Sequence, residues 1–232
     1  MVRTQRASQD IPDIVVSRLP LYLQALTSLQ EQGMAVIKSH ELAAVVQATP
    51  AQIRKDFSYF GKFGKQGMGY SVERLLSEIR LILGLDRTWN LAIVGLGRVG
   101  RALVSYRGFL HQGFHIVAAF DQSPKVIGKK VGRLVVQDMA YLQEALKTQG
   151  VDIGVVAVPV AEAQKVVNQL VQCGIKGILN YAPTTPQVPP GVQLRTVDPV
   201  PSLQSMTFYL KEASTAKVRA KRRSRPKGRA FP

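Results

Sequence analysis

The run Ile93-Val94-Gly95-Leu96-Gly97-Arg98-Val99-Gly100 sets the tightest limit on how this chain can fold. It begins as a buried strand and passes at once into glycines spaced G-x-G-x-x-G. Such a turn needs its first glycine for a tight reversal, its second for close approach of a pyrophosphate, and its third for packing of helix against strand. The helix expected next, from Arg98 to His111, would point its N-terminus at the phosphates. We therefore predict a dinucleotide site that includes Gly95, Leu96, Gly97, Arg98, Val99 and Gly100.

A second expected strand, residues 115–120, ends at Asp121, which lies 26 residues after the first glycine of the turn. An acid at that strand end accepts hydrogen bonds from the adenine ribose hydroxyls and repels a 2′-phosphate, so it favours NAD over NADP. Further strands are expected at 151–158 and 175–181, with a helix at 161–173 between them. This alternation predicts an α/β fold with a Rossmann-type, doubly wound parallel sheet.

The carboxyl ends of the later strands should form the crevice for the nicotinamide, because ligands of such sheets bind at that edge. Those strand ends are Val158-Pro159 and Asn180-Tyr181-Ala182-Pro183, and we take Val158, Pro159 and Asn180 from them as cofactor-binding candidates. Tyr106, on the helix after the glycine turn, is an aromatic candidate close to the cofactor. Its spacing alone favours a packing role.

The chain shows little catalytic equipment. A dehydrogenase needs a proton donor or acceptor at the crevice, and the histidines are only His40, His111 and His115. The first lies in the N-terminal third, and the other two are expected at a helix end and at the strand end opposite the crevice. We expect all three to be structural, and no metal-ligand cluster, nucleophile elbow or carboxylate pair is visible.

The N-terminal third predicts a second kind of binding element. A leucine-rich helix is expected over 17–32, and another should begin with Ser39 as its N-cap. Three residues after it, a third helix opens with Thr49 at the N-cap, Pro50 at N1 and Gln52 at N3, which is a capping box. Two helices joined by so short a turn are typical of a helix-turn-helix, whose second helix presents its N-terminal residues to DNA bases.

Apolar side chains recur along this third helix and should face the core: Ile53, Phe57 and Phe60. The remaining surface carries side chains suited to DNA: Gln52, Arg54, Lys55, Ser58 and Tyr59. The glutamine and arginine suit base edges, and the lysine and serine suit phosphates. A solvated face on an ordinary helix would carry the same residues, so this pattern alone leaves both interpretations open.

The segment after this helix favours DNA binding. Residues 61–70 alternate glycines with lysine, aromatic and glutamine residues, which predicts a tight hairpin or loop. Lys62 and Lys65 would form a phosphate-binding wing, and Ser71 should cap a further helix over 72–83. The order of these elements predicts a winged-helix domain.

The net charge of +16 is concentrated at the C-terminus, where residues 211–232 carry nine Lys/Arg against one Glu. By composition this segment is a disordered basic arm that would bind any polyanion; a merely solubilising tail remains an alternative. The single cysteine, Cys173, cannot form an internal disulfide, which predicts a reducing cytoplasm. Absence of a long apolar run predicts no membrane span.

Taken in this order, the elements resemble the Rex family of bacterial redox-sensing repressors over about Ile11 to Leu210. Four stretches carry the resemblance: Ser17-Arg18-Leu19-Pro20-Leu21-Tyr22, Ile53-Arg54-Lys55-Asp56-Phe57-Ser58-Tyr59-Phe60-Gly61, Gly174-Ile175-Lys176-Gly177-Ile178-Leu179-Asn180 and Val197-Asp198. The resemblance implies a homodimer that binds a near-palindromic operator and releases it when NADH replaces NAD. It also implies that a C-terminal helix, 201–211, swaps into the partner subunit.

By the same resemblance, Tyr106 corresponds to a tyrosine that responds to the nicotinamide, and Asp198 to an acid that changes partners between two states. The chain departs from the family where an arginine often follows the tyrosine of the first helix by two positions, because Gln24 stands there. A full ion pair with Asp198 is then impossible. The basic tail lies outside the resemblance.

These observations predict a winged-helix domain (1–85), a Rossmann domain binding NAD or NADH (86–200), a swapped helix (201–211) and a disordered tail (212–232). The leading function is an NADH-sensitive repressor that binds double-stranded operator DNA and is not an enzyme. The main alternative is an NAD-dependent oxidoreductase with an accessory basic domain. A protein that binds the nucleoid without sequence preference is the third.

Overall fold

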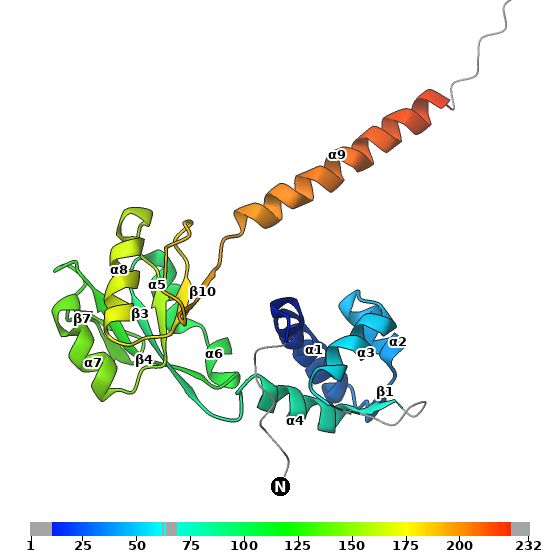
Figure 1. Ribbon diagram of the computed structural model, residues 1–232. Coiled ribbons are helices and arrows are strands. Elements are labelled where there is room, and N and C mark those ends of the chain that lie inside the picture. Colours follow the sequence, from blue (N-terminus) through cyan, green and yellow to red (C-terminus); the bar gives the residue numbers. More distant parts are fainter. Residues whose placement is uncertain (1–10, 62, 64–68, 224–232) are drawn as a thin grey trace, which may run out of the picture. The chain divides into compact units, whose positions relative to one another are not determined.

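The computed structural model describes residues 11–61, 63 and 69–223, with 213–223 as helical backbone only. The chain divides into two compact units between Thr88 and Trp89 (Figure 1).

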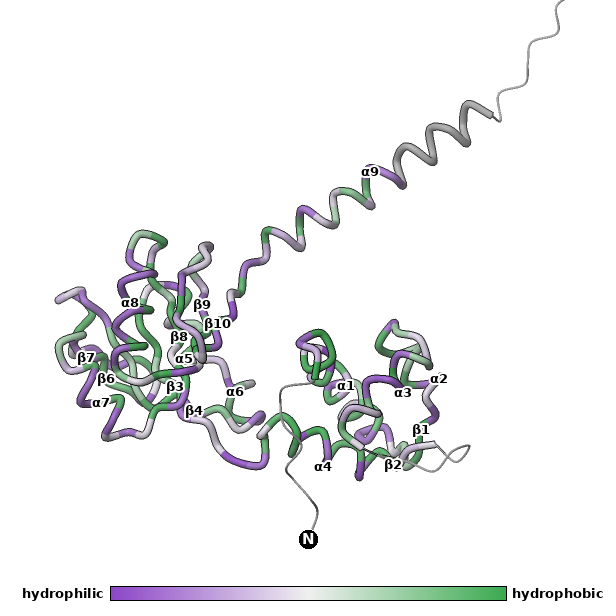
Figure 2. The backbone as a smooth tube through the Cα atoms, in the orientation of Figure 1, coloured by the Kyte–Doolittle hydropathy of each residue, from purple (hydrophilic) through white to green (hydrophobic). Residues whose placement is uncertain are grey.

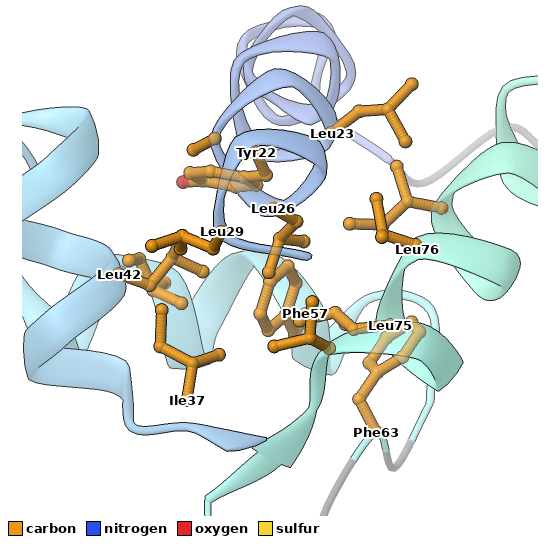
Figure 3. Close-up of a cluster of buried hydrophobic side chains, with 14 of the residues drawn as sticks. Tyr22, Leu23, Leu26, Leu29, Ile37, Leu42, Phe57, Phe63, Leu75 and Leu76 are labelled. Carbon is orange, nitrogen blue, oxygen red and sulfur yellow. The ribbon is translucent and has the colours of Figure 1, made fainter. Parts of the chain in front are cut away.

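The first unit is built from short helices and one pair of two-residue strands. Its elements are α1 (Asp13–Glu31), β1 (Val36–Ile37), α2 (Ser39–Val46), α3 (Pro50–Ser58), β2 (Tyr70–Ser71) and α4 (Val72–Ile82). The two strands pair antiparallel, so a helix-turn-helix is followed by a strand that returns to the sheet, as in a winged-helix domain. Figure 3 shows the core of this unit, where side chains from all four helices meet, among them Tyr22, Leu26, Leu42, Phe57 and Leu75.

Helix starts in this unit follow local capping. The Thr49 Oγ1 accepts a hydrogen bond from the Gln52 backbone N–H at 3.1 Å, so the predicted start of α3 is confirmed. In α2 the N-cap is Lys38 instead of Ser39, and its backbone N–H donates to the Glu41 carboxylate at 2.6 Å. Helix α1 begins at Asp13, four residues before the predicted start, because Val15 extends its buried face.

The second unit contains a sheet of six parallel strands in the order β10-β9-β8-β3-β4-β7. The strands are β3 (Trp89–Val94), β4 (Phe114–Asp121), β7 (Gln137–Asp138), β8 (Ile153–Val156), β9 (Gly177–Asn180) and β10 (Gln193–Thr196). A small antiparallel hairpin, β5 (Lys130–Val131) with β6 (Leu134–Val135), stands beside it. Numbered along the chain within the sheet, the order is 3-2-1-4-5-6, the dinucleotide-binding arrangement. The predicted fold class is confirmed.

Helices cover both faces of this sheet. Four helices of this unit precede the last helix of the described chain: α5 (Arg98–Ser105), α6 (Gly108–His111), α7 (Leu142–Thr148) and α8 (Val160–Gln172). A 3-10 turn at Met139–Tyr141 leads into α7. Helices α7 and α8 pack on the face that holds Val94 and Phe120, whereas α5 packs on the face that holds Ile93. The hydrophobic colour along β3 and β8 in Figure 2 reflects this burial on both sides.

Three predicted boundaries in this unit are wrong. The helix expected over 98–111 is broken after Ser105, where Tyr106 takes extended backbone angles before α6. The strands expected over 151–158 and 175–181 are shorter, because their outer residues form the loops that frame the site. Strand β10 escaped prediction because its four residues lack an apolar run and three of them are exposed.

The last helix, α9 (Val200–Arg223), is longer than expected. The sequence from Ser202 to Arg223 contains neither glycine nor proline and is rich in alanine, lysine and arginine, which favour helix. The prediction that the chain is disordered from residue 212 is therefore wrong as far as Arg223, and 224–232 lie outside the described residues. Within the described part of the chain, no helix is long and apolar enough to cross a membrane.

Candidate dinucleotide and nucleic-acid sites

The three glycines after β3 meet three different surroundings. Gly95 has a φ of +96°, and a Cβ there would lie 2.5 Å from the carbonyl oxygen of Ala157. A Cβ on Gly100 would lie 1.9 Å from the carbonyl oxygen of Gly95. A Cβ on Gly97 would have no atom within 4 Å. The first and third glycines thus permit close packing, and the second faces open space where a ligand can approach.

A cavity of about 590 Å³ opens beside this turn, at the carboxyl ends of β3, β4 and β8. Most of the residues predicted to bind the cofactor line it: Gly95, Leu96, Gly97, Arg98, Asp121, Val158 and Pro159. Four do not appear among its lining residues: Val99, Gly100, Tyr106 and Asn180. The cavity lies where the strand order of the sheet reverses, which is where open α/β sheets bind ligands.

The Asp121 carboxylate joins two loops at this cavity. Its Oδ2 accepts the Leu96 backbone N–H at 2.7 Å, and its Oδ1 accepts the Ser123 backbone N–H at 2.8 Å. A carboxylate has about four lone-pair sites, so this one can also accept hydrogen bonds from a ribose diol. Arg98 and Arg101 supply positive charge to the same cavity, and the Arg101 Nε donates to the Leu96 carbonyl at 2.9 Å.

The Asn180 side chain is buried and holds the turn after β9. Its Nδ2 donates to the carbonyl oxygens of Ala182 at 2.9 Å and Thr184 at 2.8 Å, and its Oδ1 accepts the Ala182 N–H at 3.0 Å. The structure does not bring Asn180 to the cavity. Its hydrogen bonds shape the loop that follows the strand.

Tyr106 stands at the junction of α5 and α6 and is 60% exposed. Its ring packs edge-on against Phe109 at a centroid distance of 5.1 Å. Burial, and to a smaller degree the Tyr106 phenol, raise the pKa of Tyr181, which directly follows Asn180. Tyr181 lies in the strand-end segment that the sequence predicts to line the crevice, but it is not among the residues that line the cavity.

None of the three histidines of the chain joins this group, whereas Glu162 and Lys165 line the cavity. His40, His111 and His115 are exposed, and none of them lines the cavity.

Helix α3 presents a polar surface on one side and core residues on the other. Ile53 and Phe57 are buried, whereas Arg54, Lys55, Ser58 and Tyr59 are exposed. The Arg54 Nη1 donates to the Ser39 hydroxyl at 3.1 Å, which links α3 to α2. Gln52 is half-buried at the start of the helix. The predicted wing lysines, Lys62 and Lys65, lie outside the described residues.

Sequence reasoning missed a buried carboxylate on α3, that of Asp56, which is 0% exposed. Its Oδ2 accepts the Arg18 Nε at 2.6 Å and the Tyr22 hydroxyl at 2.5 Å. Its Oδ1 accepts the Arg18 Nη2 at 2.7 Å and the Gln52 Nε2 at 2.7 Å. Burial opposes ionisation, but hydrogen bonds from Arg18, Tyr22 and Gln52 outweigh it and lower the pKa of Asp56. An acid three positions after Ile53, on the buried side of the helix, was the available signal.

Two residues expected to take part in the allosteric response, Gln24 and Asp198, belong to different units. Gln24 is exposed on α1. Asp198 is half-buried before α9, and its Oδ1 accepts the Val200 N–H at 2.9 Å.

Comparison with known proteins finds relatives over most of the chain. Family models match residues 10–58, as a putative DNA-binding protein N-terminus, and residues 86–184, as a CoA binding domain. The redox-sensing transcriptional repressor Rex of Chloroflexus aurantiacus is 49% identical over 199 residues, covering 86% of this chain and 94% of the relative. The repressor of the same name from Streptomyces griseus is 41% identical over 230 residues, covering 99% and 91%.

Solved structures agree with these relatives. RSP, a Rex-family repressor, in complex with NADH has a TM-score of 0.82 and 34% identity, covering 90% of this chain and 98% of its own. RSP in complex with NAD⁺ and operator DNA has a TM-score of 0.82 and 34% identity, covering 97% and 100%.

Proposed function

This chain belongs to the Rex family of redox-sensing transcriptional repressors, and we propose that it binds operator DNA and releases it when NADH replaces NAD. One observation carries the proposal: a single chain holds a glycine-turn cavity with Asp121 at its edge and a helix that exposes Arg54 and Lys55. Binding of a dinucleotide in the cavity can then change the affinity of the same chain for DNA.

The DNA contacts follow from the exposed surface of α3. Arg54 and Gln52 are proposed to contact base edges, and Lys55, Ser58 and Tyr59 to contact the backbone with the wing lysines Lys62 and Lys65. A near-palindromic operator requires two such helices, and hence a homodimer. Apolar side chains exposed on α9 support a swapped helix as the dimer element: Leu203, Met206, Phe208 and Leu210.

Discrimination between the two cofactor states must arise near the nicotinamide ring. NADH and NAD share the pyrophosphate and both riboses, so the contacts of the glycine turn and Asp121 cannot distinguish them. A ligand shifts an equilibrium between two dimer states only by its differential affinity for them. We assign this discrimination to Tyr106. Asp198 exchanges partners between the two dimer states, and Gln24 stands where an arginine could form an ion pair with it.

An operator-binding titration tests the proposal. Duplexes are first selected from a random pool by the protein with NAD, and the affinity for the best duplex is then measured at several NADH/NAD ratios and constant total dinucleotide. We expect the affinity to fall as the NADH fraction rises. An affinity that is independent of this ratio contradicts the proposal.

Two other functions give different results in the same preparation. An NAD-dependent oxidoreductase with an accessory basic domain would turn over NADH with some member of a panel of small carbonyl substrates. We expect no turnover, since the exposed histidines lie off the cavity. A nonspecific nucleoid protein would bind random and selected duplexes equally. We place the protein in the cytoplasm, as its lone Cys173 predicts.

The proposed cofactor choice depends on Asp121. Asp121→Ala should weaken NADH binding and narrow the preference for NADH over NADPH, because the ribose diol loses an acceptor and the 2′-phosphate loses a repelling charge. Titration of both dinucleotides into both proteins measures this, with the exposed Asp86→Ala as the matched control. If the wild type binds NADPH as tightly as NADH, this role of Asp121 is wrong.

A further inference from the structure

The carboxylate of Asp56 is fully occupied by donors. Each of its two oxygens accepts two hydrogen bonds: Oδ2 from the Arg18 Nε and the Tyr22 hydroxyl, and Oδ1 from the Arg18 Nη2 and the Gln52 Nε2. A carboxylate offers about four lone-pair sites, so none is left over. The group is completely buried and has no hydrogen of its own to donate.

This occupancy fixes which way the Gln52 amide points. The two ends of a glutamine amide differ only in that the nitrogen donates and the oxygen accepts. The end that faces Asp56 at 2.7 Å must be the nitrogen, because an oxygen there would meet an ionised oxygen with no proton between them. A flip of the amide, which a neutral or hydroxylic neighbour would allow, is excluded.

The rest of the amide remains available. Among the residues that the structure describes, none hydrogen-bonds to the Gln52 Oε1, and Nε2 keeps a second N–H. In the major groove, the Oε1 acceptor can accept from the N6 amino group of adenine while the Nε2 donor donates to N7. No other single base presents a donor and an acceptor side by side there. Gln52 lies at the N-terminal end of α3, the part of such a helix that reaches the bases.

We propose that Asp56 is a positioning residue for DNA recognition, holding the Gln52 amide in the one orientation that recognises adenine. The proposal rests on the proposed function, since it requires α3 to bind DNA. It adds an assignment of base type to residue 52 and a second role to a carboxylate that otherwise joins α1 to α3.

The experiment uses the full chain with NAD and the best duplex selected from a random pool. Each operator adenine is replaced in turn by 7-deazaadenine, which lacks N7, or by purine, which lacks the N6 amino group. We expect one adenine per half-site at which both replacements weaken wild-type binding by about tenfold. Gln52→Ala should bind less tightly and should be indifferent to both replacements at that adenine.

Two variants of the buried cluster separate positioning from stability. Asp56→Asn should lose the sensitivity to both replacements, because the asparagine offers either a donor or an acceptor to Gln52. Tyr22→Phe removes a donor from Oδ2 alone and leaves the Oδ1 bond to Gln52. It should therefore lower stability yet keep the sensitivity. If Asp56→Asn does not fold, the double variant Arg18→Met/Asp56→Asn serves instead. It removes both charges of the pair, which costs less than leaving one charge buried without its partner. It also removes the carboxylate that orients the Gln52 amide, so it should lose the sensitivity to both replacements.

Several outcomes overturn the proposal. It fails if Gln52→Ala keeps wild-type sensitivity at every adenine, or if folded Asp56→Asn or the folded double variant does. It also fails if Tyr22→Phe loses the sensitivity together with stability, because the cluster would then act only on the fold. A wild type that prefers no duplex over random DNA overturns the proposed function itself, and this result is distinct from the others.

Discussion

Gly97 and Gly100 lie three residues apart, and the same substitution should affect ligand binding at the first and stability at the second. A methyl group on Gly100 would collide with the Gly95 carbonyl oxygen, so α5 must move away from β3. Gly100→Ala should lower the free energy of unfolding by about 1–3 kcal/mol, the usual cost of overpacking. Gly97→Ala meets open space and should keep the fold, yet weaken dinucleotide binding because the methyl group obstructs the pyrophosphate. Chemical denaturation and NADH titration measure the two effects, and equal dinucleotide affinity of Gly97→Ala and wild type would contradict this assignment.

The acid stability of the first unit should depend on Asp56. Its pKa is lowered in the folded protein, so its contribution is present above the ordinary carboxylate pKa and is lost as pH falls through the folded-state value. Asp56→Asn should cost about 3 kcal/mol at neutral pH, the lower range for a broken buried ion pair, because Arg18 is 22% exposed. Denaturation between neutral pH and about pH 3 should show a smaller pH dependence in this variant. The exposed Glu31→Gln is the control, and identical pH profiles for all three proteins would refute the assignment.

Residues whose role depends on near neighbours in the sequence were predictable, and residues with distant partners were not. The glycine turn and Asp121 belong to one local strand–turn–helix–strand unit. Asp56 interacts with side chains 34 and 38 positions away, and only the folded chain brings them together. Asn180 was assigned to the cofactor because strand ends usually face a ligand, but its partners lie in the loop that follows it and at Thr196 of β10.

At the scale of elements, the starts of helices were more predictable than their ends. Thr49 and Ser71 cap the helices that follow them through their own hydroxyl groups, which a sequence shows directly. At the end of α5 the chain leaves the helix at Tyr106, whose ring lies 2.4–2.5 Å from where a Gly108 Cβ would be. The helix propensities of residues 98–111 do not show this break.

The junction of α5 and α6 should couple the cofactor to DNA release. Tyr106→Phe should keep NADH binding but require a higher NADH/NAD ratio for release, because it removes the hydroxyl assigned to the nicotinamide end. Tyr141→Phe, equally exposed at 60%, is the matched control. Asp198→Ala should also alter the response, and Gln24→Arg should shift the ratio needed by restoring an ion-pair partner. If all of these variants release DNA at the wild-type ratio, the coupling lies elsewhere.

Half of the excess positive charge of the molecule follows Leu210. Removal of residues 213–232 deletes eight Lys/Arg and no acid. If these cations bind DNA, the slope of log K against log salt should fall by about 0.9 for each phosphate that the shortened chain no longer neutralises. The preference for operator over random DNA and the NADH response should stay. Substitution of the eight cations by glutamine keeps the length of the chain and should lower the slope as the truncation does. If both variants keep the wild-type slope, the segment is a solubilising tail.

The length of helix α9 determines how far its basic end lies from its start. Its 24 residues rise about 1.5 Å each, so its basic end lies about 36 Å from its start. That length is close to one turn of duplex DNA, about 34–36 Å. Cations at one end of a straight helix of this length lie too far away to contact a phosphate at its other end. If these cations bind the duplex, nuclease protection of a long fragment should shrink when the segment is removed.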